Sequence, residues 1–257
     1  MIGRILRLSP IALVLVVTAA ACGGGGSKTV TVTVTTSTPS STATGASTSL
    51  RVYFLLNGKV QPVLRTVPQT TAVAGAALNA LLEGPTAQEQ QLGLSSQVSS
   101  ESSLNVERSG GVLVVHGDVP DGAPLAQVVY TATQFANAQT VEVNGKRYTR
   151  SGFEDFTPAI LVELPLPYQS VSSPMRLAGT ANTFEATFEY ELKDAAGRTL
   201  ARHFVTATSG NGMRGTYDVT IRFRATSGGT GSLRVWEDSA ANGKPVNAVE
   251  IPVQIER

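Results

Sequence analysis

The sequence is poor in the residue types that build catalytic and metal centres. Its 257 residues include one cysteine, two histidines and one tryptophan. A single cysteine excludes an intramolecular disulfide, so the fold has to rely on hydrophobic cores. The two histidines, His116 and His203, lie far apart in the chain, whereas a metal site needs clustered ligands. The sequence therefore predicts no metal site and no cofactor.

Residue patterns for catalysis and for nucleic-acid binding are also missing. The 20 basic and 19 acidic residues nearly cancel, whereas nucleic-acid-binding domains carry a basic excess. No serine lies in a Gly-x-Ser-x-Gly elbow, and the serine-rich stretch 95–103 is interpreted as a loop. Glu154 and Asp155 are adjacent acids, whose side chains would point opposite ways on an extended chain. We therefore predict no catalytic residue and a protein that is not an enzyme.

The N-terminal apolar run, Ile11–Val17, is too short to span a bilayer, which requires roughly 20 residues. It follows Arg4 and Arg7 and precedes a run of small residues from Ala19 that ends at Cys22. A basic start, a short apolar stretch and small residues before a cleavage point are typical of a secretory signal. The Ala-Ala-Ala-Cys sequence resembles the lipobox of bacterial lipoproteins, whose cysteine receives a diacylglyceryl group.

This resemblance implies that residues 1–21 are a lipoprotein signal peptide and that Cys22 is the lipid-attachment site. Two or more acyl chains, such as palmitate, hold a protein firmly, so we expect a cell-membrane anchor on the extracytoplasmic face. The alternative is an ordinary secreted protein with an unpaired cysteine. Residues 22–49, rich in Gly, Ser and Thr, predict a disordered, flexible tether with a span of about 30 Å. Residues 29–35 alternate Thr and Val, which is also a strand pattern.

Residues 50–156 have the pattern of an α+β domain. Strands are predicted at Arg51–Leu56 and Val60–Val67, joined by a turn at Asn57 and Gly58. Apolar residues at helical spacing predict two helices, at Ala72–Leu82 and Leu125–Phe135. Further strands are predicted at 104–107, 112–115 and 140–143.

Residues 158–257 predict an all-β domain. Short strands separated by turns, about seven in roughly 100 residues, are typical of an antiparallel immunoglobulin-like sandwich. We interpret Trp236 as a core residue of that sandwich, with a binding aromatic as the alternative. Asp238, beside Ser239, is interpreted as part of a local turn. The predicted strands cover residues 159–164, 175–181, 184–193, 199–208, 215–224, 231–238 and 246–255.

Two stretches of sequence resemble known bacterial domains. The first region resembles the GerMN domain, through Val52-Tyr53-Phe54, Glu83-Gly84-Pro85, the segment 130–135 (Tyr-Thr-Ala-Thr-Gln-Phe) and Val141-Glu142-Val143-Asn144-Gly145. The second resembles the immunoglobulin-like domain of bacterial spore germination. That likeness lies in residues 164–167, 171–174, 179–181, 184–185, 194–197, 236–240 and 251–253. It departs from the usual pattern at Tyr168 and at 242–244.

The resemblance implies a function without transferring any catalytic residue. It favours a non-enzymatic cell-envelope lipoprotein that binds or assembles other envelope proteins in envelope processes or in processes related to sporulation or germination. The alternative is a sensory lipoprotein that binds a small ligand and modulates a membrane sensor kinase. A large apolar pocket with converging polar groups would favour the alternative, whereas exposed sheet edges would favour the protein-binding module.

Overall fold

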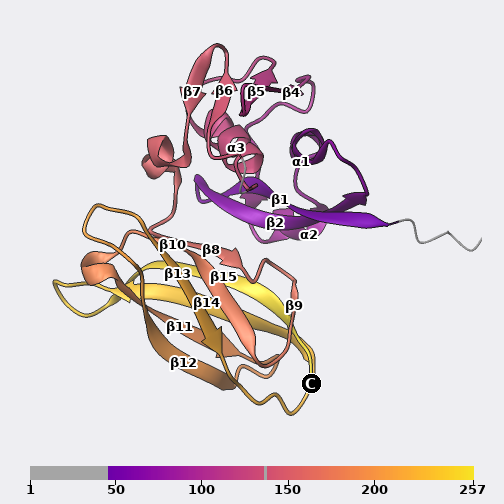
Figure 1. The fold of residues 1–257 in the computed structure, drawn as a ribbon. Coiled ribbons are helices and arrows are strands. Elements are labelled where there is room, and N and C mark those ends of the chain that lie inside the picture. Colours follow the sequence, from indigo (N-terminus) through magenta and orange to yellow (C-terminus); the bar gives the residue numbers. More distant parts are fainter. Residues whose placement is uncertain (1–45, 136–137) are drawn as a thin grey trace, which may run out of the picture. The chain divides into compact units, whose positions relative to one another are not determined.

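The computed structural model describes residues 46–135 and 138–257 (Figure 1). The expected signal peptide, Cys22 and the expected tether up to residue 45 lie outside the described residues. Within the described ranges, no helix combines the length and the apolar character needed to cross a bilayer. The elements are β1 (Ser47–Leu56), β2 (Lys59–Pro68), α1 (Val73–Leu82), α2 (Ala87–Gln91), β3 (Leu94–Ser95), β4 (Asn105–Ser109), β5 (Val112–His116), α3 (Ala123–Ala132), β6 (Val141–Val143), β7 (Lys146–Tyr148), the 3-10 helix η1 (Arg150–Phe156), β8 (Ile160–Leu164), β9 (Ser170–Val171), β10 (Met175–Ala181), the 3-10 helix η2 (Phe184–Ala186), β11 (Thr187–Lys193), β12 (Thr199–Thr206), β13 (Gly215–Ile221), β14 (Gly229–Asp238) and β15 (Pro245–Ile255).

The first region is the expected α+β domain of strands and helices. One sheet has the order β2-β1-β3 and the other the order β4-β5-β6-β7. The hairpin of β1 and β2 closes at Asn57 and Gly58, which have φ angles of 52° and 76°. Positive φ at both positions suits a two-residue turn whose twist matches that of the strands. Buried residues of α1, α3 and both sheets share one core, which includes Leu78, Val129 and Val141.

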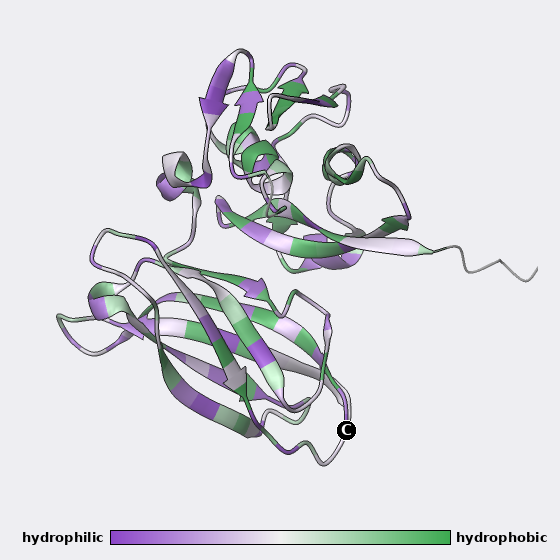
Figure 2. Cartoon of the chain, viewed as in Figure 1, coloured by the Kyte–Doolittle hydropathy of each residue, from purple (hydrophilic) through white to green (hydrophobic). Residues whose placement is uncertain are grey.

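The second region is the expected β-sandwich. One sheet has the order β13-β10-β8, and the other has the order β12-β11-β14-β15-β9. Phe188, Tyr190 and Leu192 alternate along β11 and face the sandwich core. Figure 2 shows hydrophobic and hydrophilic residues alternating along the sandwich strands, because one face of each sheet is buried and the other is not.

Strand β8 contributes to both cores. Ile160 and Val162 belong to the core of the sandwich, whereas Leu161 belongs to the core of the first region. Successive side chains of a strand point to opposite faces, so this alternation places each face of β8 against a different core. The short connector η1 leads directly into this strand.

Several elements differ from the expected ones. The described residues contain three α-helices instead of two, because Thr86 and Glu89 form a reciprocal capping box that starts α2. Strand β1 begins at Ser47, inside the expected tether and before the expected strand start at Arg51, because β2 continues to Pro68 and pairs with it. The start of the expected strand 184–193 is the 3-10 turn η2, in which Glu185 has a φ of 53°.

Trp236 is buried, but it is not part of the sandwich core, so its expected placement was wrong. Leu233 and Val235 face the core from β14, and the next residue, Trp236, therefore faces outward. The guanidinium groups of Arg202 and Arg234 lie 5.0 and 5.2 Å from the centre of the indole and cover it. The indole Nε1–H donates to Asp238.

Replacement of Gly179 should test how tightly β8 and β10 pack. A Cβ atom there would lie 2.0 Å from the Leu161 carbonyl oxygen and 2.7 Å from the Tyr217 hydroxyl oxygen. We expect Gly179→Ala to lower the free energy of unfolding by about 1–3 kcal/mol, because this overpacking forces the strands apart. Gly75→Ala is the matched control: it meets no atom within 4 Å and should raise stability by about 0.5–1 kcal/mol within α1. Urea denaturation that finds equal stability for the two variants would contradict the packing shown here.

Candidate functional site

Arg150, the first residue of η1, is the centre of a largely buried polar cluster; its side chain is 25% exposed. The guanidinium donates to Glu163 Oε1 at 2.8 Å, to Thr133 Oγ1 at 2.9 Å and to the carbonyl of Tyr130 at 3.0 Å. It also lies 5.1 Å from the ring centre of Tyr53 and 4.7 Å from that of Tyr130. Such contacts favour a cation over an aromatic face. Arg150 therefore binds β1, α3 and β8 at once.

Glu163, on β8, is the anionic partner in this cluster. Burial on its own raises the pKa of Glu163, but the charge of Arg150 and hydrogen bonds from Tyr53 and Arg150 outweigh it, so the net pKa lies below the ordinary range. Arg51 lies 3.8 Å away and adds positive charge. Burial is also the main reason why the pKa of Tyr53 lies well above its ordinary value. Glu163 is therefore ionised, and Tyr53 stays a neutral donor to it.

Side chains of α3 and of the residues just after it satisfy one edge of β1. The Arg51 N–H donates to Gln134 Oε1 at 2.7 Å, and Gln134 Nε2 donates back to the Arg51 carbonyl at 2.6 Å. The Tyr53 N–H donates to Thr131 Oγ1, and Gln127 Nε2 donates to the Tyr53 carbonyl. These side chains take the place of a neighbouring strand, because β3 pairs only with the end of β1.

A second ion pair joins η1 to the sandwich. Arg214 donates to both carboxylate oxygens of Glu154, at 2.9 and 2.8 Å, and Asn182 donates to the same carboxylate at 2.8 Å. The hydrogen bonds from Arg214 are the main reason why the pKa of Glu154 lies below its ordinary value. Asp155 is exposed, and its carbonyl accepts a hydrogen bond from Lys59. The two neighbouring acids therefore have separate roles and do not form a catalytic pair.

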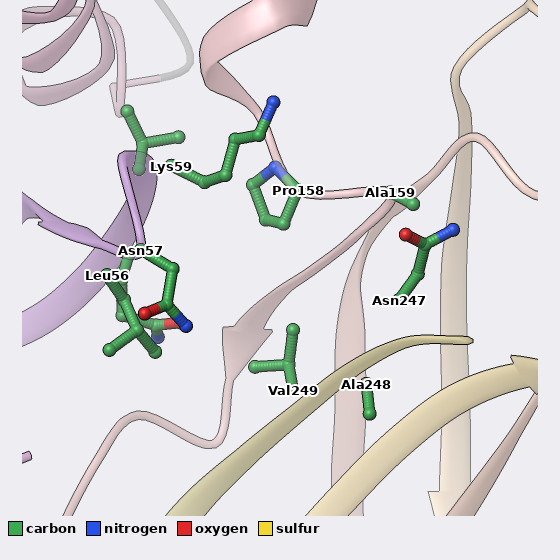
Figure 3. A pocket seen from close by; sticks show the side chains of 10 residues that line it. Leu56, Asn57, Lys59, Pro158, Ala159, Asn247, Ala248 and Val249 are labelled. Atoms are coloured by element: carbon green, nitrogen blue, oxygen red, sulfur yellow. The ribbon is translucent and has the colours of Figure 1, made fainter. Parts of the chain in front are cut away.

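A hollow of about 270 Å³ lies between the tip of the β1–β2 hairpin and the start of β15. Figure 3 shows Leu56 and Asn57 on one side of it and Ala248 and Val249 on the other. Its lining mixes apolar side chains with three amides and one cation. The lining residues are Leu56, Asn57, Lys59, Val60, Gln61, Pro158, Ala159, Asn247, Ala248 and Val249.

The first half of β15 borders this hollow and has one open edge. β14 pairs with β15 along its length, but β9 pairs only with Gln254 and Ile255 on the other side. Among the described residues, no strand pairs with that second side between Val246 and Ile251. The side chains from Pro245 to Ala248 are exposed. This stretch is therefore an accessible sheet edge.

Comparisons with known families agree with these two folds. Residues 51–149 match a family described as sporulation and spore germination, and residues 159–244 match the immunoglobulin-like domain of bacterial spore germination. This chain is a GerMN protein with an immunoglobulin-like spore-germination domain. A solved structure of tandem GerMN domains of the sporulation protein GerM from Bacillus subtilis is similar at 15% identity, with a TM-score of 0.32. The similarity covers 71% of this chain and 63% of that one. No curated protein matches.

The motif residues of the GerMN domain have structural roles. Thr131 and Gln134, within the segment that resembles the family pattern, bind the edge of β1. Asn144 and Gly145 form the tight turn between β6 and β7, with φ angles of 52° and 73°. Gly84, after α1, also has a positive φ. The resemblance rests on residues that hold the fold together.

The histidines and the serine-rich stretch lie outside the polar cluster. His116 ends β5, is exposed, and lies 3.1 Å from Glu107 Oε1. His203 is exposed on β12, and its ring lies beside that of Phe204. Within the serine-rich stretch, Ser96 Oγ accepts hydrogen bonds from the Val98 N–H and the Gln127 amide. Within the described residues, no three His, Cys, Asp or Glu side chains are placed to share a metal ion.

Sequence reasoning missed Arg150 and Glu163. One signal was present: Glu163 is the only acid in the otherwise apolar run of β8, Ile-Leu-Val-Glu-Leu. A charge in a strand with two buried faces requires a partner. The partner itself could not be found from periodicity, because Arg150 lies in an irregular connector.

Removal of one member of the central ion pair should strongly destabilise the protein. We expect Glu163→Gln to cost about 3–5 kcal/mol, because it leaves the Arg150 charge buried without an anion. The double variant Arg150→Met/Glu163→Leu should cost less than the sum of its single variants. Because the pKa of Glu163 is lowered by folding, its contribution is complete above the unfolded value of about 4.3 and declines as the pH falls through the folded pKa.

Urea midpoints measured between about pH 6 and pH 3 check both statements. Glu163→Gln should flatten this pH dependence. The remaining slope should come from the other carboxyl groups whose pKa values are lowered, which are Glu89, Glu154, Glu191, Asp194 and Asp218. Additive single costs, or an unchanged pH profile, would refute the role given to this pair.

Replacement of Gln134 should show how much its hydrogen bonds to the β1 backbone stabilise the protein. Gln134→Ala removes both bonds to the Arg51 backbone, and we expect a loss of about 2–3 kcal/mol because a half-buried N–H and C=O lose their partners. Gln90→Ala serves as the control, since Gln90 makes one exposed bond to Pro85 and its loss should change stability by about 0.5 kcal/mol or less. Amide hydrogen exchange should show faster exchange at Arg51 in Gln134→Ala. Unchanged protection there would contradict this assignment.

Proposed function

We propose that this protein is a non-enzymatic lipoprotein of the cell envelope, anchored through Cys22 on the extracytoplasmic face, and that it binds or assembles other envelope proteins. The GerMN and immunoglobulin-like domains support a role related to sporulation or germination. The lipid anchor is supported by the Ala-Ala-Ala-Cys sequence at residues 19–22. The proposed contact with the membrane is made through the lipid, and the proposal includes neither a metal nor a nucleic acid.

The observation that carries the proposal is the edge of β15 between Val246 and Ile251, which no strand covers among the described residues. Edge strands invite pairing with other chains, and proteins usually protect them with charges or prolines. Several other edge strands carry such protection: Pro62 and Pro68 on β2, Glu107 and Arg108 on β4, Lys146 and Arg147 on β7, and Arg202 and His203 on β12. On β15, the segment Val246–Val249 carries no charge and no proline, but Pro245 and Glu250 flank it and Asn247 has a φ of 52°. An accessible edge with this little charge suits a protein that works through contact.

The hollow is small for a sensory pocket. Pockets for small ligands usually measure about 300–1,000 Å³ and enclose most of the ligand, whereas this hollow measures about 270 Å³. Its position beside an open sheet edge favours protein binding over the sensory alternative.

Crosslinking in intact envelopes tests the proposal. The wild-type chain should fractionate with membranes and crosslink to a reproducible set of envelope proteins, and Cys22→Ser should lose both properties because the domains are no longer held at high local concentration. His116→Ala and His203→Ala change exposed residues outside the polar cluster, so both should retain the crosslinks.

If Cys22→Ser stays processed and membrane-bound, the lipoprotein assignment fails. If either folded histidine variant loses its biological activity while its crosslinks persist, a catalytic or ligand site must exist.

A further inference from the structure

We propose that one end of the immunoglobulin-like domain makes a second contact with the membrane, at which Phe184 and Met213 insert into the interfacial layer of the bilayer. The two residues lie in neighbouring segments, the 3-10 turn η2 and the loop 207–214 between β12 and β13 (together, the apolar loops). This inference rests on the lipid anchor in the proposed function and adds the face of the protein that meets the bilayer.

Exposed apolar side chains are concentrated at this end of the sandwich. Five large hydrophobic residues in the described ranges are exposed, and Phe184 and Met213, at 56% and 71%, are among the three most exposed. Val246, at 39%, is close to them, because Glu237, its partner across β14 and β15, accepts from the Phe184 N–H. A group of exposed apolar residues marks a contact site, whereas single scattered ones need no explanation.

Hydrogen bonds hold the apolar loops together as one platform. The Asn211 N–H donates to the Thr183 carbonyl at 3.1 Å, and the Glu185 N–H donates to Asn211 Oδ1 at 2.9 Å. The Gly212 N–H donates to Asn182 Oδ1 at 2.9 Å. The two apolar side chains are therefore carried by backbone segments whose positions are fixed relative to each other.

The turn η2 keeps Phe184 on the surface at a cost in backbone energy. Glu185 and Ala186 have φ angles of 53° and 58°, which residues other than glycine seldom adopt. Such conformations persist where the surrounding structure imposes them, and they cluster at functional sites. Phe184 belongs to the residues by which this domain resembles its family, yet it packs into neither hydrophobic core. Its place is therefore that of a contact residue.

The apolar loops carry little free charge. Arg214 donates to both carboxylate oxygens of Glu154, so its charge is balanced within the protein. Glu185 is the one exposed charged residue of the apolar loops, and the next turn carries Asp238 and Lys244, whose charges are opposite. An acid on its own is repelled by an anionic lipid surface. Apolar insertion, and not attraction to lipid headgroups, therefore has to carry the proposed contact.

The size of this surface favours a bilayer over a protein partner. A stable protein interface buries about 800 Å² on each side, from roughly 20–30 residues, whereas the apolar loops offer only a few apolar side chains. A small contact suffices when the second surface is always near, because the lipid holds the protein at high effective concentration. Apolar side chains in the interface then add to the acyl chains as a further membrane signal.

The chain between the anchor and the fold permits this orientation. Cys22 precedes Ala46, the first described residue, by 24 positions. At about 3.3 Å per residue, this length reaches up to roughly 80 Å. A compact fold of this size has a radius of gyration of about 17 Å. The length therefore allows any face to meet the bilayer, and the apolar loops select one.

Protein held on vesicles tests this orientation. The mature chain with Cys22→Ser and an N-terminal hexahistidine tag is bound to vesicles that contain a nickel-chelating lipid, so the tag replaces the natural anchor. Because Cys22 is the only cysteine, Met213→Cys introduces a single site for an environment-sensitive nitrobenzoxadiazole label. Phe204→Cys is the matched control, since Phe204 is also strongly exposed, at 59%, but lies on β12. The vesicles consist of phosphatidylcholine, with or without phosphatidylglycerol.

The label at position 213 should shift its emission to the blue on both kinds of vesicle and resist reduction by aqueous dithionite, whereas the label at position 204 should do neither. Without the tag, Phe184→Ser and Met213→Ser should each weaken the partition of the unlabelled chain into vesicles about fivefold, and Phe204→Ser should stay within roughly twofold. Glu185→Gln should strengthen binding to the anionic vesicles only. Circular dichroism melts check that each variant is folded.

Three results would overturn the proposal. One is that the labels at positions 213 and 204 respond alike. Another is vesicle binding that requires phosphatidylglycerol and is unchanged in Phe184→Ser, which would assign the contact to headgroup charge. The third is that the label at position 213 responds to neither kind of vesicle; a loss of envelope crosslinks in Phe184→Ser would then assign the apolar loops to a protein partner. If insertion fails while the wild-type chain still fractionates with membranes and keeps its crosslinks, the proposed function stands and only this contact fails.

Discussion

The structure depends on how one cation, Arg150, is kept away from water. A guanidinium cannot lose its charge in a protein, so a largely buried one requires fixed acceptors around it. Those acceptors come from β8 and α3, and the aromatic faces that flank it come from β1 and α3. The position of each of these elements is therefore constrained by the same group. Glu163 gives the arrangement its charge balance, and the lowered pKa of that carboxyl shows that pairing outweighs the cost of burial.

The connection between the two domains follows from this constraint. Arg150 and Glu154 both lie in η1, and each forms an ion pair with a residue of the immunoglobulin-like domain, Glu163 or Arg214. Strand β8 then divides its faces between the two cores. The hollow and the open edge of β15 occur where the hairpin of the GerMN domain faces the sandwich. The shape of the hollow therefore depends on contacts between the two domains.

Much of the fold could be predicted from local sequence, and the site could not. The apolar spacing of α1 and the Asn57-Gly58 turn are short-range signals, and both were read correctly. The helix α2 was missed although Thr86 and Glu89 show the capping-box spacing, because five residues carry too little periodicity. The placement of Trp236 failed because burial by two arginines is not visible in a strand pattern. The contact of Tyr53 with Glu163 joins residues 110 positions apart. The open edge of β15 depends on where β9 stops pairing. Neither feature can be recognised from a short stretch of sequence.

The two-sided strand β8 has a consequence for how such proteins can evolve. Domains that are joined by a neutral linker can be exchanged by recombination, because each brings its complete core. Here an exchange at residue 158 would separate Arg150 from β8. The first strand of the incoming domain would then need a residue like Leu161 for the core of the GerMN domain, and two positions later an acid like Glu163 to pair with Arg150. Most incoming partners would lack that pair. The ancestry of the GerMN domain and of its immunoglobulin-like neighbour should therefore be linked, with substitutions at Arg150, Leu161 and Glu163 inherited together.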